Sequence, residues 1–571
     1  MKNIVLCSDG TGNKGGYGED SNVFKTYKAT KVFDCDQYSF YDQGVGTDKS
    51  DNTKNKYWVA VSGAFGFGFR ANVLHLYHFL IRTYNPGDTI FLFGFSRGAA
   101  TVRAFAGFLN ACGLIDRHHP NLKKSNNFDH DLKILVEEAF ECYRQRLKTP
   151  KMAQDFKEQY AVKDPAHAPD GNLKIKFVGV WDTVSALGFP DEDFSILLRL
   201  MGKLAKTVAE IVPGWSYKFY DYDLNNSIEN AYHALSIDDK RKTFTPLVWN
   251  ENGYMGHVEQ VWFAGVHSNV GGGYPRTGLS DVALRWMLHK AQAQGLLLHP
   301  EHLVAIESGM NVYDKLYDSR DGFAIYYSYD PRNLATLCQD EKTKQHKLKG
   351  KIALHITAYN KMKETSDSYT PYSLPPVFDV VDIDKEQVTR PTIVKKNVAV
   401  PDSARQTWNE LEASMQKIIQ ARKLLYTVFV ETTMIILLVA GWMWVHQPQS
   451  VSELNACELN QVQIAQPAKT ALAPSDIAAT PLKVFEQAIA PTDSETPPKF
   501  CEKANSRLLK PVGDILRYLT PVYFENFITY VVEVQPWIFV ALLGALYYMN
   551  RKSKQYIDDL NRVCGKLCAL L

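Results

Sequence analysis

The sequence predicts an α/β domain with a mostly parallel sheet and helical insertions, followed by a C-terminal transmembrane helical hairpin. Three observations lead to this prediction. Short apolar runs typical of strands alternate with helical patterns over about the first 270 of the 571 residues, and such alternation favours a parallel sheet. A Gly-x-Ser-x-Gly motif stands between one of these strands and the helix that follows it. Two long apolar stretches lie near the C-terminus.

The α/β domain is expected to span residues 1–400. Its strands are short apolar runs bounded by turn signals, at residues 2–8, 89–93, 173–181 and 258–266. Its helices carry broad apolar faces, at residues 69–84 and 99–112. Polar insertions are expected at about residues 117–172 and 190–232. The second contains an amphipathic segment, 194–212, which is either a helix packed on the core or a lid that contacts lipid.

The C-terminal part of the sequence predicts two membrane spans. Residues 424–445 form a stretch of 22 residues with a single charge, Glu431, and a bilayer span needs about 20 residues. Residues 527–549 are a weaker candidate because Glu533 and Pro536 interrupt them. The alternative is a buried helical hairpin in a soluble domain. The expected order is juxtamembrane helix, first span, extracytoplasmic loop, second span and basic tail, at residues 402–423, 424–445, 446–526, 527–549 and 550–571.

Basic residues flank both predicted spans on the same side of the membrane. They are Lys417, Arg422 and Lys423 before the first span, and Arg551, Lys552 and Lys554 after the second. The positive-inside rule therefore places the α/β domain and the C-terminal tail on the cytoplasmic side. The connecting loop would lie outside, where Cys457 and Cys501 could form a disulfide.

Composition excludes several classes of function. The chain has 64 Lys and Arg against 62 Asp and Glu, a formal net charge of +2, whereas nucleic-acid-binding proteins usually show a strong basic excess. The nine cysteines include no Cys-x-x-Cys pair, so neither a zinc site nor a disulfide scaffold is indicated. We therefore expect no nucleic-acid partner, no metal and no cofactor.

The motif at residues 94–98, Gly-Phe-Ser-Arg-Gly, is the strongest chemical signal. It follows a predicted strand and opens a predicted helix, which is the context of a nucleophile elbow in an α/β-hydrolase fold. Such a turn presents the central serine hydroxyl above the sheet, at the positive end of the helix. Ser96 is therefore the candidate nucleophile.

A serine hydroxyl needs a base, and the expected chain order is Ser, Asp or Glu, His. Asp182 follows the strand that ends at residue 181, and His267 follows the strand that ends at residue 266. Carboxyl ends of parallel strands meet at one edge of the sheet, where ligands bind. Asp182 and His267 are thus the candidate acid and base, with Asp238 and Asp239 as alternative acids.

The oxyanion of the reaction needs two backbone donors. One is expected to be the N–H of Arg97, the residue after the nucleophile. The other is expected from the loop after the first strand, at Gly10 or Thr11. That loop lacks the Gly-x-x-x-x-Gly-Lys and Gly-x-Gly-x-x-Gly patterns of phosphate-binding loops, which argues against nucleotide binding.

Six blocks stand in one order along the chain: CSDGTGN at 7–13, YDQGVGT at 41–47, GFSRGA at 94–99, VWDTV at 180–184, HAL at 233–235 with Arg241 and Pro246, and HSNVGGGY at 267–274. Together they resemble the catalytic domain of the phospholipase effectors of bacterial type VI secretion, and the wider family of α/β-hydrolases around it, over about residues 1–380. The resemblance implies a lipase with a Ser96–Asp182–His267 triad and an oxyanion role for the loop at Gly10 and Thr11. It also implies glycerophospholipid esters as substrates, cleaved at the A1 or A2 position.

The sequence thus predicts a membrane-anchored phospholipase A in the bacterial inner membrane, with its catalytic domain on the cytoplasmic side. It would be either a resident enzyme or an antibacterial secretion effector. Expected partners are the phospholipid membrane, the lipid substrate, and a secretion-apparatus spike or an immunity protein. Two alternatives remain open: an esterase or thioesterase acting on a soluble acyl substrate, and a catalytically silent hydrolase-like membrane scaffold.

Overall fold

The protein is seen here in a computed structural model. The structure describes residues 1–571 with the exception of 11, 14, 31–35, 45–63, 124–126, 165–170, 186–219, 322–326, 364–368, 383–392 and 446–535. The candidate donor Thr11, the amphipathic segment 194–212 and the predicted loop 446–526 with Cys457 and Cys501 therefore lie outside the described residues.

The strands of the described residues form one sheet that is parallel except at one edge. Their spatial order is β2 (Gln37–Asp42), β1 (Asn3–Ser8), β3 (Thr89–Phe95), β4 (Ile175–Trp181), β5 (Ile228–Ser236), β6 (His257–Phe263), β7 (Ala353–His355), β8 (Val377–Asp382) and β9 (Ile393–Ala399). Only β9 pairs antiparallel, with β8. The prediction of a mostly parallel α/β sheet is therefore confirmed.

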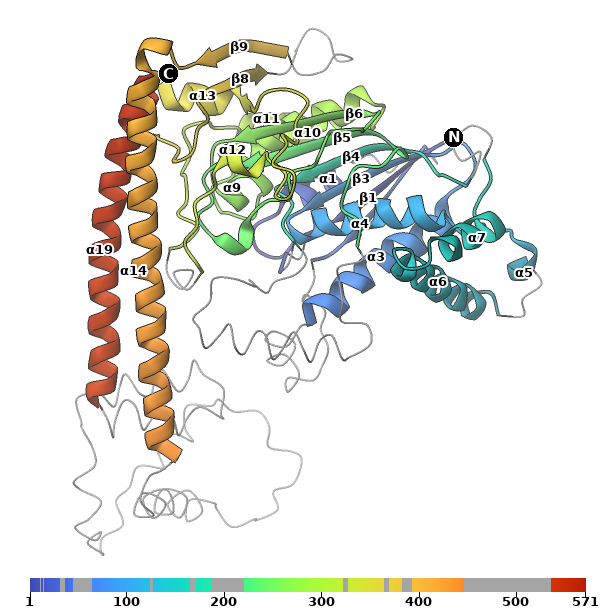
Figure 1. Ribbon diagram of the computed structural model, residues 1–571. Helices are drawn as coiled ribbons and strands as arrows, with labels where there is room; N and C mark the ends of the chain where they lie inside the picture. Colours follow the sequence, from blue (N-terminus) through green and yellow to red (C-terminus); the bar gives the residue numbers. More distant parts are fainter. Residues whose placement is uncertain are drawn as a thin grey trace, which may run out of the picture. The chain divides into compact units, whose positions relative to one another are not determined.

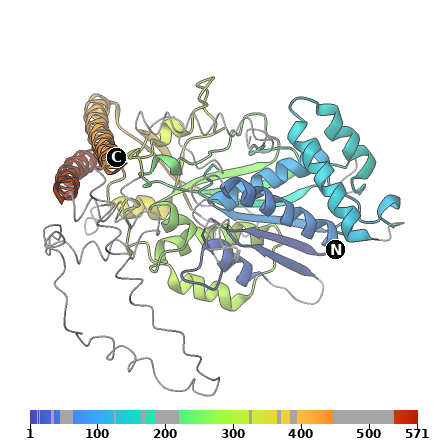
Figure 2. The same ribbon diagram turned by 90° about the horizontal axis from the view of Figure 1, so that it is seen from below.

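Helices cover both faces of this sheet (Figures 1 and 2). The helices before β4 are α1 (Asn22–Ala29), α3 (Ala64–Thr83), α4 (Arg97–Cys112), α5 (Pro120–Lys123), α6 (Phe128–Gln145) and α7 (Pro150–Tyr160). Those after β5 are η1 (Lys242–Phe244), α9 (His267–Gly271), α10 (Gly278–Ala293), α11 (Pro300–Gly309), α12 (Leu334–Leu337), α13 (Ile356–Lys363), η3 (Asp402–Ala404), α14 (Arg405–Val445) and α19 (Pro536–Ala569).

The central strands are apolar on both faces because alternate side chains enter two different cores. Ile4 and Leu6 of β1 pack with α3, α4 and α6, whereas Val5 and Cys7 pack with α1 and α10. This two-sided burial explains why β1, β3 and β4 are recognisable in the sequence as continuous apolar runs. Strand β5 begins at Ile228, before the expected end of the second insertion at residue 232. Its buried face includes the polar His233, which hides the strand pattern.

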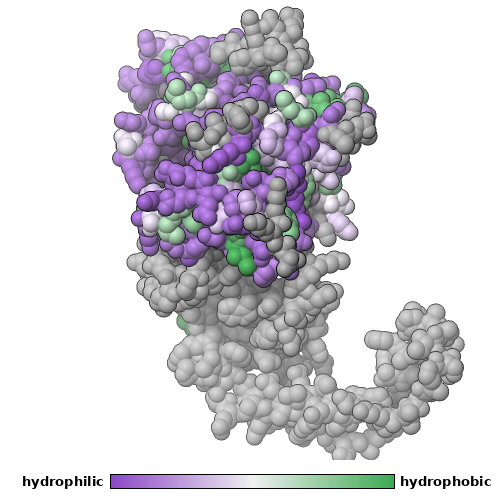
Figure 3. All heavy atoms as spheres, turned by 90° about the vertical axis from the view of Figure 1, so that its right-hand side faces the viewer, coloured by the Kyte–Doolittle hydropathy of each residue, from purple (hydrophilic) through white to green (hydrophobic). Residues whose placement is uncertain are grey.

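Contacts divide the chain into two compact units, Met1–Tyr426 with Lys554–Leu571, and Thr427–Ser553. Within the first unit, the beginning of α14 and the end of α19 pack together. Trp408 and Met415 of α14 share a buried cluster with Leu560 and Cys564 of α19. The face of the described structure seen in Figure 3, which is the right-hand side of Figure 1, carries mainly hydrophilic residues with hydrophobic ones scattered among them.

The predicted transmembrane hairpin is not confirmed, because no helix among the described residues is both long and apolar enough to cross a membrane. The expected juxtamembrane helix and the apolar stretch 424–445 form one continuous helix of 41 residues, α14. The described helix at the second span, α19, starts at Pro536. Its apolar part, up to Met549, is about 21 Å long at 1.5 Å per residue, shorter than the roughly 30 Å hydrocarbon core.

Candidate active site

Ser96 lies at a strained turn between β3 and α4. Its backbone has φ 58° and ψ −122°, a left-handed region that non-glycine residues rarely adopt. The flanking glycines make the turn sterically feasible. A Cβ on Gly94 would lie 2.6 Å from the Gly98 carbonyl oxygen, and a Cβ on Gly98 would lie 2.1 Å from the Ser8 carbonyl oxygen. The Gly-x-Ser-x-Gly spacing therefore gives the tight strand-to-helix crossing that the sequence analysis predicts.

Asp182 lies beside this turn, at the end of the neighbouring strand. The last residues of β3 and β4, Phe95 and Trp181, are paired in register, and the Ser96 N–H donates to the Trp181 carbonyl oxygen at 3.1 Å. Asp182 is fully buried and also has a positive φ, 41°. The parallel sheet thus brings Ser96 and Asp182 to the same edge, as expected.

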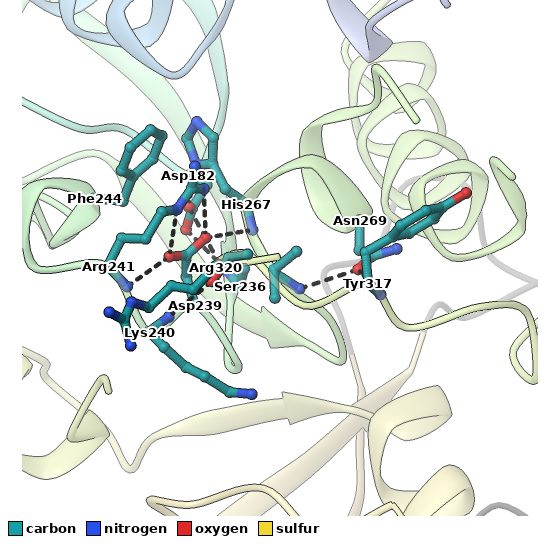
Figure 4. Close-up of polar contacts among 12 residues, drawn as sticks. Asp182, Ser236, Asp239, Lys240, Arg241, Phe244, His267, Asn269, Tyr317 and Arg320 are labelled. Carbon is teal, nitrogen blue, oxygen red and sulfur yellow. Dashed lines mark hydrogen bonds and ion pairs between the residues drawn. The ribbon is translucent and has the colours of Figure 1, made fainter. Parts of the chain in front are cut away.

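His267 is the first residue of α9, the helix that follows β6. In the sheet, β6 lies two strands away from β4, the strand that Asp182 follows. Nδ1 of His267 lies 2.5 Å from Oδ2 of Asp182 (Figure 4). The ring packs against Phe95, the residue before Ser96, with 4.6 Å between ring centroids, and against Phe244 at 4.9 Å. Among the described residues, Nε2 is buried without a hydrogen-bond partner. A proton on Nδ1, donated to Asp182, leaves the lone pair on Nε2 available to accept another proton.

Electrostatics keep the acid charged and the base neutral. Burial opposes ionisation of Asp182, but the Arg332 charge and the bond to His267 outweigh it, so the pKa of this carboxyl lies well below its usual value. Burial also lowers the pKa of His267, although Asp182 partly offsets this effect. At neutral pH the pair is therefore an aspartate and a neutral imidazole, which is the state a general base requires.

Arg332 is a member of this cluster that the sequence analysis missed. Its Nη1 donates to Oδ1 of Asp182 at 2.6 Å, and its Nη2 donates to Oδ2 at 2.8 Å. Arg332 stands in no recognisable motif and lies 150 residues from Asp182 along the chain. Neither periodicity nor spacing could have pointed to it.

The two alternative acids have other partners. Asp239 accepts bonds from the Arg241 side chain and, at 3.1 Å, from the His267 backbone N–H (Figure 4). Asp238 accepts from the Tyr369 hydroxyl and the Gly265 N–H, each at 2.7 Å. Only Asp182 bonds to the imidazole ring of His267 among the described residues. Asp238 and Asp239 instead hold the loop on which His267 stands.

Of the predicted oxyanion donors, Arg97 and Gly10 are among the described residues. Arg97 is the first residue of α4, and the N–H groups of a first helical turn point away from the helix at its positive end. Gly10 lies against the nucleophile, because a Cβ added to it would be 3.2 Å from the Ser96 Cβ. However, the Gly10 N–H donates to Oδ1 of its neighbour Asp9 at 2.6 Å.

Asp9 organises the loop that faces Ser96. Its carboxylate also accepts from Ser21 at 2.6 Å, Tyr41 at 2.7 Å and Asn13 at 3.1 Å. Burial raises the pKa of Asp9 despite these bonds. Asp9, Asn13 and Tyr41 belong to the sequence blocks at 7–13 and 41–47, whereas Ser21 lies in neither block. Asp9 joins all of them in one hydrogen-bond network.

The profile of one protein family matches residues 2–290, and it is described as "T6SS, Phospholipase effector Tle1-like, catalytic domain". A curated relative, the uncharacterized protein YEL023C of Saccharomyces cerevisiae, is 25% identical over 265 residues, which cover 44% of this chain and 33% of the relative. The matched region is therefore about a third of that relative's length.

Two solved structures are also similar. An uncharacterized protein from Pseudomonas aeruginosa has a TM-score of 0.31 at 17% identity, covering 57% of this chain and 50% of that one. The Tle1 effector bound to the VgrG spike from the type VI secretion system has a TM-score of 0.32 at 13% identity, covering 57% and 78%.

Proposed function

Because the chain belongs to the Tle1-like phospholipase effector catalytic-domain family of type VI secretion, we propose that it is a serine hydrolase that cleaves acyl esters of glycerophospholipids. The observation that carries the proposal is the pairing of two features at one sheet edge. Ser96 stands in a strained elbow with φ 58°, and the buried Asp182–His267 bond of 2.5 Å leaves Nε2 of the imidazole available.

In the proposed mechanism, Nε2 of His267 takes the Ser96 proton as Oγ attacks the acyl carbonyl carbon. The Asp182 carboxylate holds the imidazole in the required tautomer and stabilises the imidazolium. The Arg97 N–H and a donor from the loop at Gly10 and Thr11 bind the oxyanion. Collapse of the tetrahedral intermediate releases the lysophospholipid alcohol, which takes the proton from His267. Water, deprotonated by His267, then attacks the acyl-enzyme and frees the fatty acid.

The acidic limb of the activity profile should lie below pH 6.5, the ordinary pKa of histidine. Only neutral His267 can act as a base, and its pKa is lowered in the fold, chiefly by burial. The kcat/KM for a soluble ester, measured between pH 4.5 and 8.5, should therefore fall only in the more acidic part of this range. An acidic limb above pH 7 would contradict the described environment of His267.

A comparison of substrates tests the proposed chemistry against the two alternatives. Phospholipid vesicles with different acyl chains at sn-1 and sn-2 should be cleaved with a higher kcat/KM than short-chain esters and thioesters, and the released chain would identify the A1 or A2 position. Turnover confined to the soluble substrates would favour an esterase or thioesterase. Absence of both turnover and serine labelling would favour a silent scaffold.

We further propose that the helix pair attaches the enzyme to a lipid bilayer. Large apolar side chains are exposed along residues 424–445 of α14 and 536–549 of α19: Leu424, Val428, Ile435, Val439, Trp537, Val540, Leu543, Leu546, Tyr547 and Tyr548. Aromatic residues followed by Arg551 and Lys552 are typical of a membrane interface. A bilayer fits this combination because it buries the apolar side chains and attracts the basic ones.

Charged substitutions in this segment should weaken membrane binding. The double variant Val540→Glu/Leu543→Glu loses the burial of two side chains worth about 1.5–3 kcal/mol each when fully buried. Its affinity for anionic phospholipid vesicles in flotation assays should fall at least roughly tenfold. The control is Val304→Glu, at a residue of α11 that is 65% exposed, and it should bind as wild type does. Equal binding by both variants would contradict membrane attachment through the helix pair.

The proposed location is the bacterial inner membrane, with the hydrolase on the cytoplasmic side. The support is the set of basic residues that precede residue 424 and follow residue 549. Protease treatment of intact spheroplasts should then spare the catalytic domain, and treatment of inverted vesicles should digest it.

We also propose a secretion spike or an immunity protein as a partner, because the chain belongs to a family of secretion effectors. Affinity capture from a type VI-secreting bacterium would test for such a partner.

A further inference from the structure

Arg332 contacts both groups that hold the imidazole of His267. Besides its two bonds to Asp182, Nη2 donates to the Phe244 carbonyl oxygen at 2.6 Å. The Phe244 ring packs edge-on against His267, with 77° between the ring planes. One guanidinium therefore bonds both to Asp182, which accepts from the imidazole, and to the backbone of Phe244, whose ring packs against the imidazole.

The Asp182 carboxylate is saturated by this arrangement. It accepts from His267, from both Nη atoms of Arg332, and from the Ser236 N–H at 2.9 Å and hydroxyl at 3.3 Å. A carboxylate offers about four lone-pair directions. Asp182 is left with no freedom to rotate away from His267, and the planar fork of Arg332 supplies two of the restraints.

The backbone of Arg332 is itself held by the loop that supports His267. Residues 328–332 run beside residues 239–242: the Lys242 N–H donates to Ser328 O at 3.0 Å, and the Asp330 N–H donates to Lys240 O at 2.8 Å. The same loop carries Asp239, which bonds to the His267 N–H. Arg332 is thus fixed relative to the base by backbone contacts as well as by its side chain.

We propose that Arg332 is a positioning residue of the acid–base pair: it locks Asp182 and Phe244 in place around His267 and moderates the pull of the aspartate charge on the imidazolium. This inference rests on the proposed serine hydrolase function. Arg332 is 5% exposed, so water does not screen its charge strongly.

The charged groups around His267 give the sign of the effect. Asp182 follows β4, Asp239 and Arg241 follow β5, and Arg332 comes from the segment before α12, while β3 and η1 contribute the uncharged rings of Phe95 and Phe244. Removing the Arg332 charge leaves Asp182 less neutralised, which stabilises the imidazolium. The acidic limb of activity should then move to higher pH.

The test measures the rate constant for labelling of Ser96 by a fluorophosphonate from pH 4.5 to 9 in the full-length protein. Arg332→Gln should lower this rate at pH 8 by roughly 10²-fold, the effect of a misplacement of about 1 Å, and raise the acidic limb by roughly 0.5–1 pH unit. Arg332→Lys keeps the charge but not the fork, so it should lose rate while its acidic limb stays at the wild-type pH.

Arg320→Gln is the matched control. Arg320 is another buried arginine, 8% exposed, that bonds to the Tyr327 carbonyl oxygen and packs on Tyr329 without contacting Asp182. It should leave the pH profile unchanged. An unshifted limb in Arg332→Gln, or the same shift in Arg320→Gln, would overturn the proposal. If Arg332→Gln does not fold, Arg332→Lys decides, because a wild-type rate in that variant contradicts the need for the fork.

These outcomes are separable from a failure of the proposed function. If wild-type protein is labelled elsewhere than Ser96, the serine hydrolase proposal fails whatever Arg332 does. If wild type is labelled at Ser96 and the Arg332 variants match it, only the positioning role fails.

Discussion

Replacing Ser96 by alanine should lower kcat by roughly 10⁴-fold or more, because the attacking oxygen is lost while the rest of the site remains. Covalent labelling by a fluorophosphonate should disappear completely. Alanine removes only an oxygen, and the strained turn is enforced by Gly94 and Gly98, so the fold should be retained. The rate is measured on a soluble ester and on phospholipid vesicles.

Ser308→Ala serves as the control for this variant. Ser308 lies on the exposed surface of α11, where its hydroxyl bonds only locally, to the Ala305 carbonyl oxygen at 2.9 Å. This variant should be labelled and should turn over as wild type does. A Ser96→Ala protein that keeps more than a tenth of the wild-type kcat would remove Ser96 from the mechanism.

The second large effect is expected at Asp182. An asparagine there can leave the imidazole in the wrong tautomer and cannot stabilise the imidazolium, so Asp182→Asn should lower kcat by roughly 10⁴-fold. Asp238→Asn is the comparison, because Asp238 is a partly buried aspartate of the same region that bonds to Tyr369 and Gly265 rather than to the ring of His267. It should change kcat by less than about tenfold, the change that 1.4 kcal/mol of barrier produces.

Asp238→Asn should also separate stability from catalysis. Burial raises the pKa of Asp238 to about 6, above the unfolded value near 3.9. Its contribution to stability is therefore fully present below the unfolded pKa and is lost as the pH rises through about 6. The neutral asparagine should raise Tm more at pH 8 than at pH 5.

If Asp238→Asn or Asp239→Asn, rather than Asp182→Asn, shows the large loss of kcat, the acid has been assigned to the wrong residue.

Local signals account for the part of the site that the sequence could predict. The elbow at Ser96 requires small residues at positions 94 and 98, so the motif records its own steric constraint. Asp182 and His267 each follow a strand whose apolar run is visible, and parallel pairing brings strand ends together. The Asp182–His267 contact confirms that these strand ends lie close to one another.

What the sequence could not predict depends on contacts between distant segments. Arg332 reaches Asp182 across 150 residues, and nothing in its neighbourhood marks it as different from other arginines. The engagement of the Gly10 N–H by Asp9 likewise requires the side chain conformation within a network that includes Ser21 and Tyr41. Hydropathy located the two apolar stretches, and the expected helix at 402–423 does run directly into the first of them, as α14 from Arg405 to Val445.

In the proposed mechanism, Ser96 is activated by the Asp182–His267 pair and cleaves phospholipid acyl esters. The most direct measurement is quantitative product analysis of mixed phospholipid vesicles incubated with wild-type and Ser96→Ala protein. We expect wild type to release equal amounts of fatty acid and lysophospholipid and Ser96→Ala to release neither. Equal release by the two proteins would contradict the assigned nucleophile, and labelling of Ser96 without any release would contradict the phospholipid substrate.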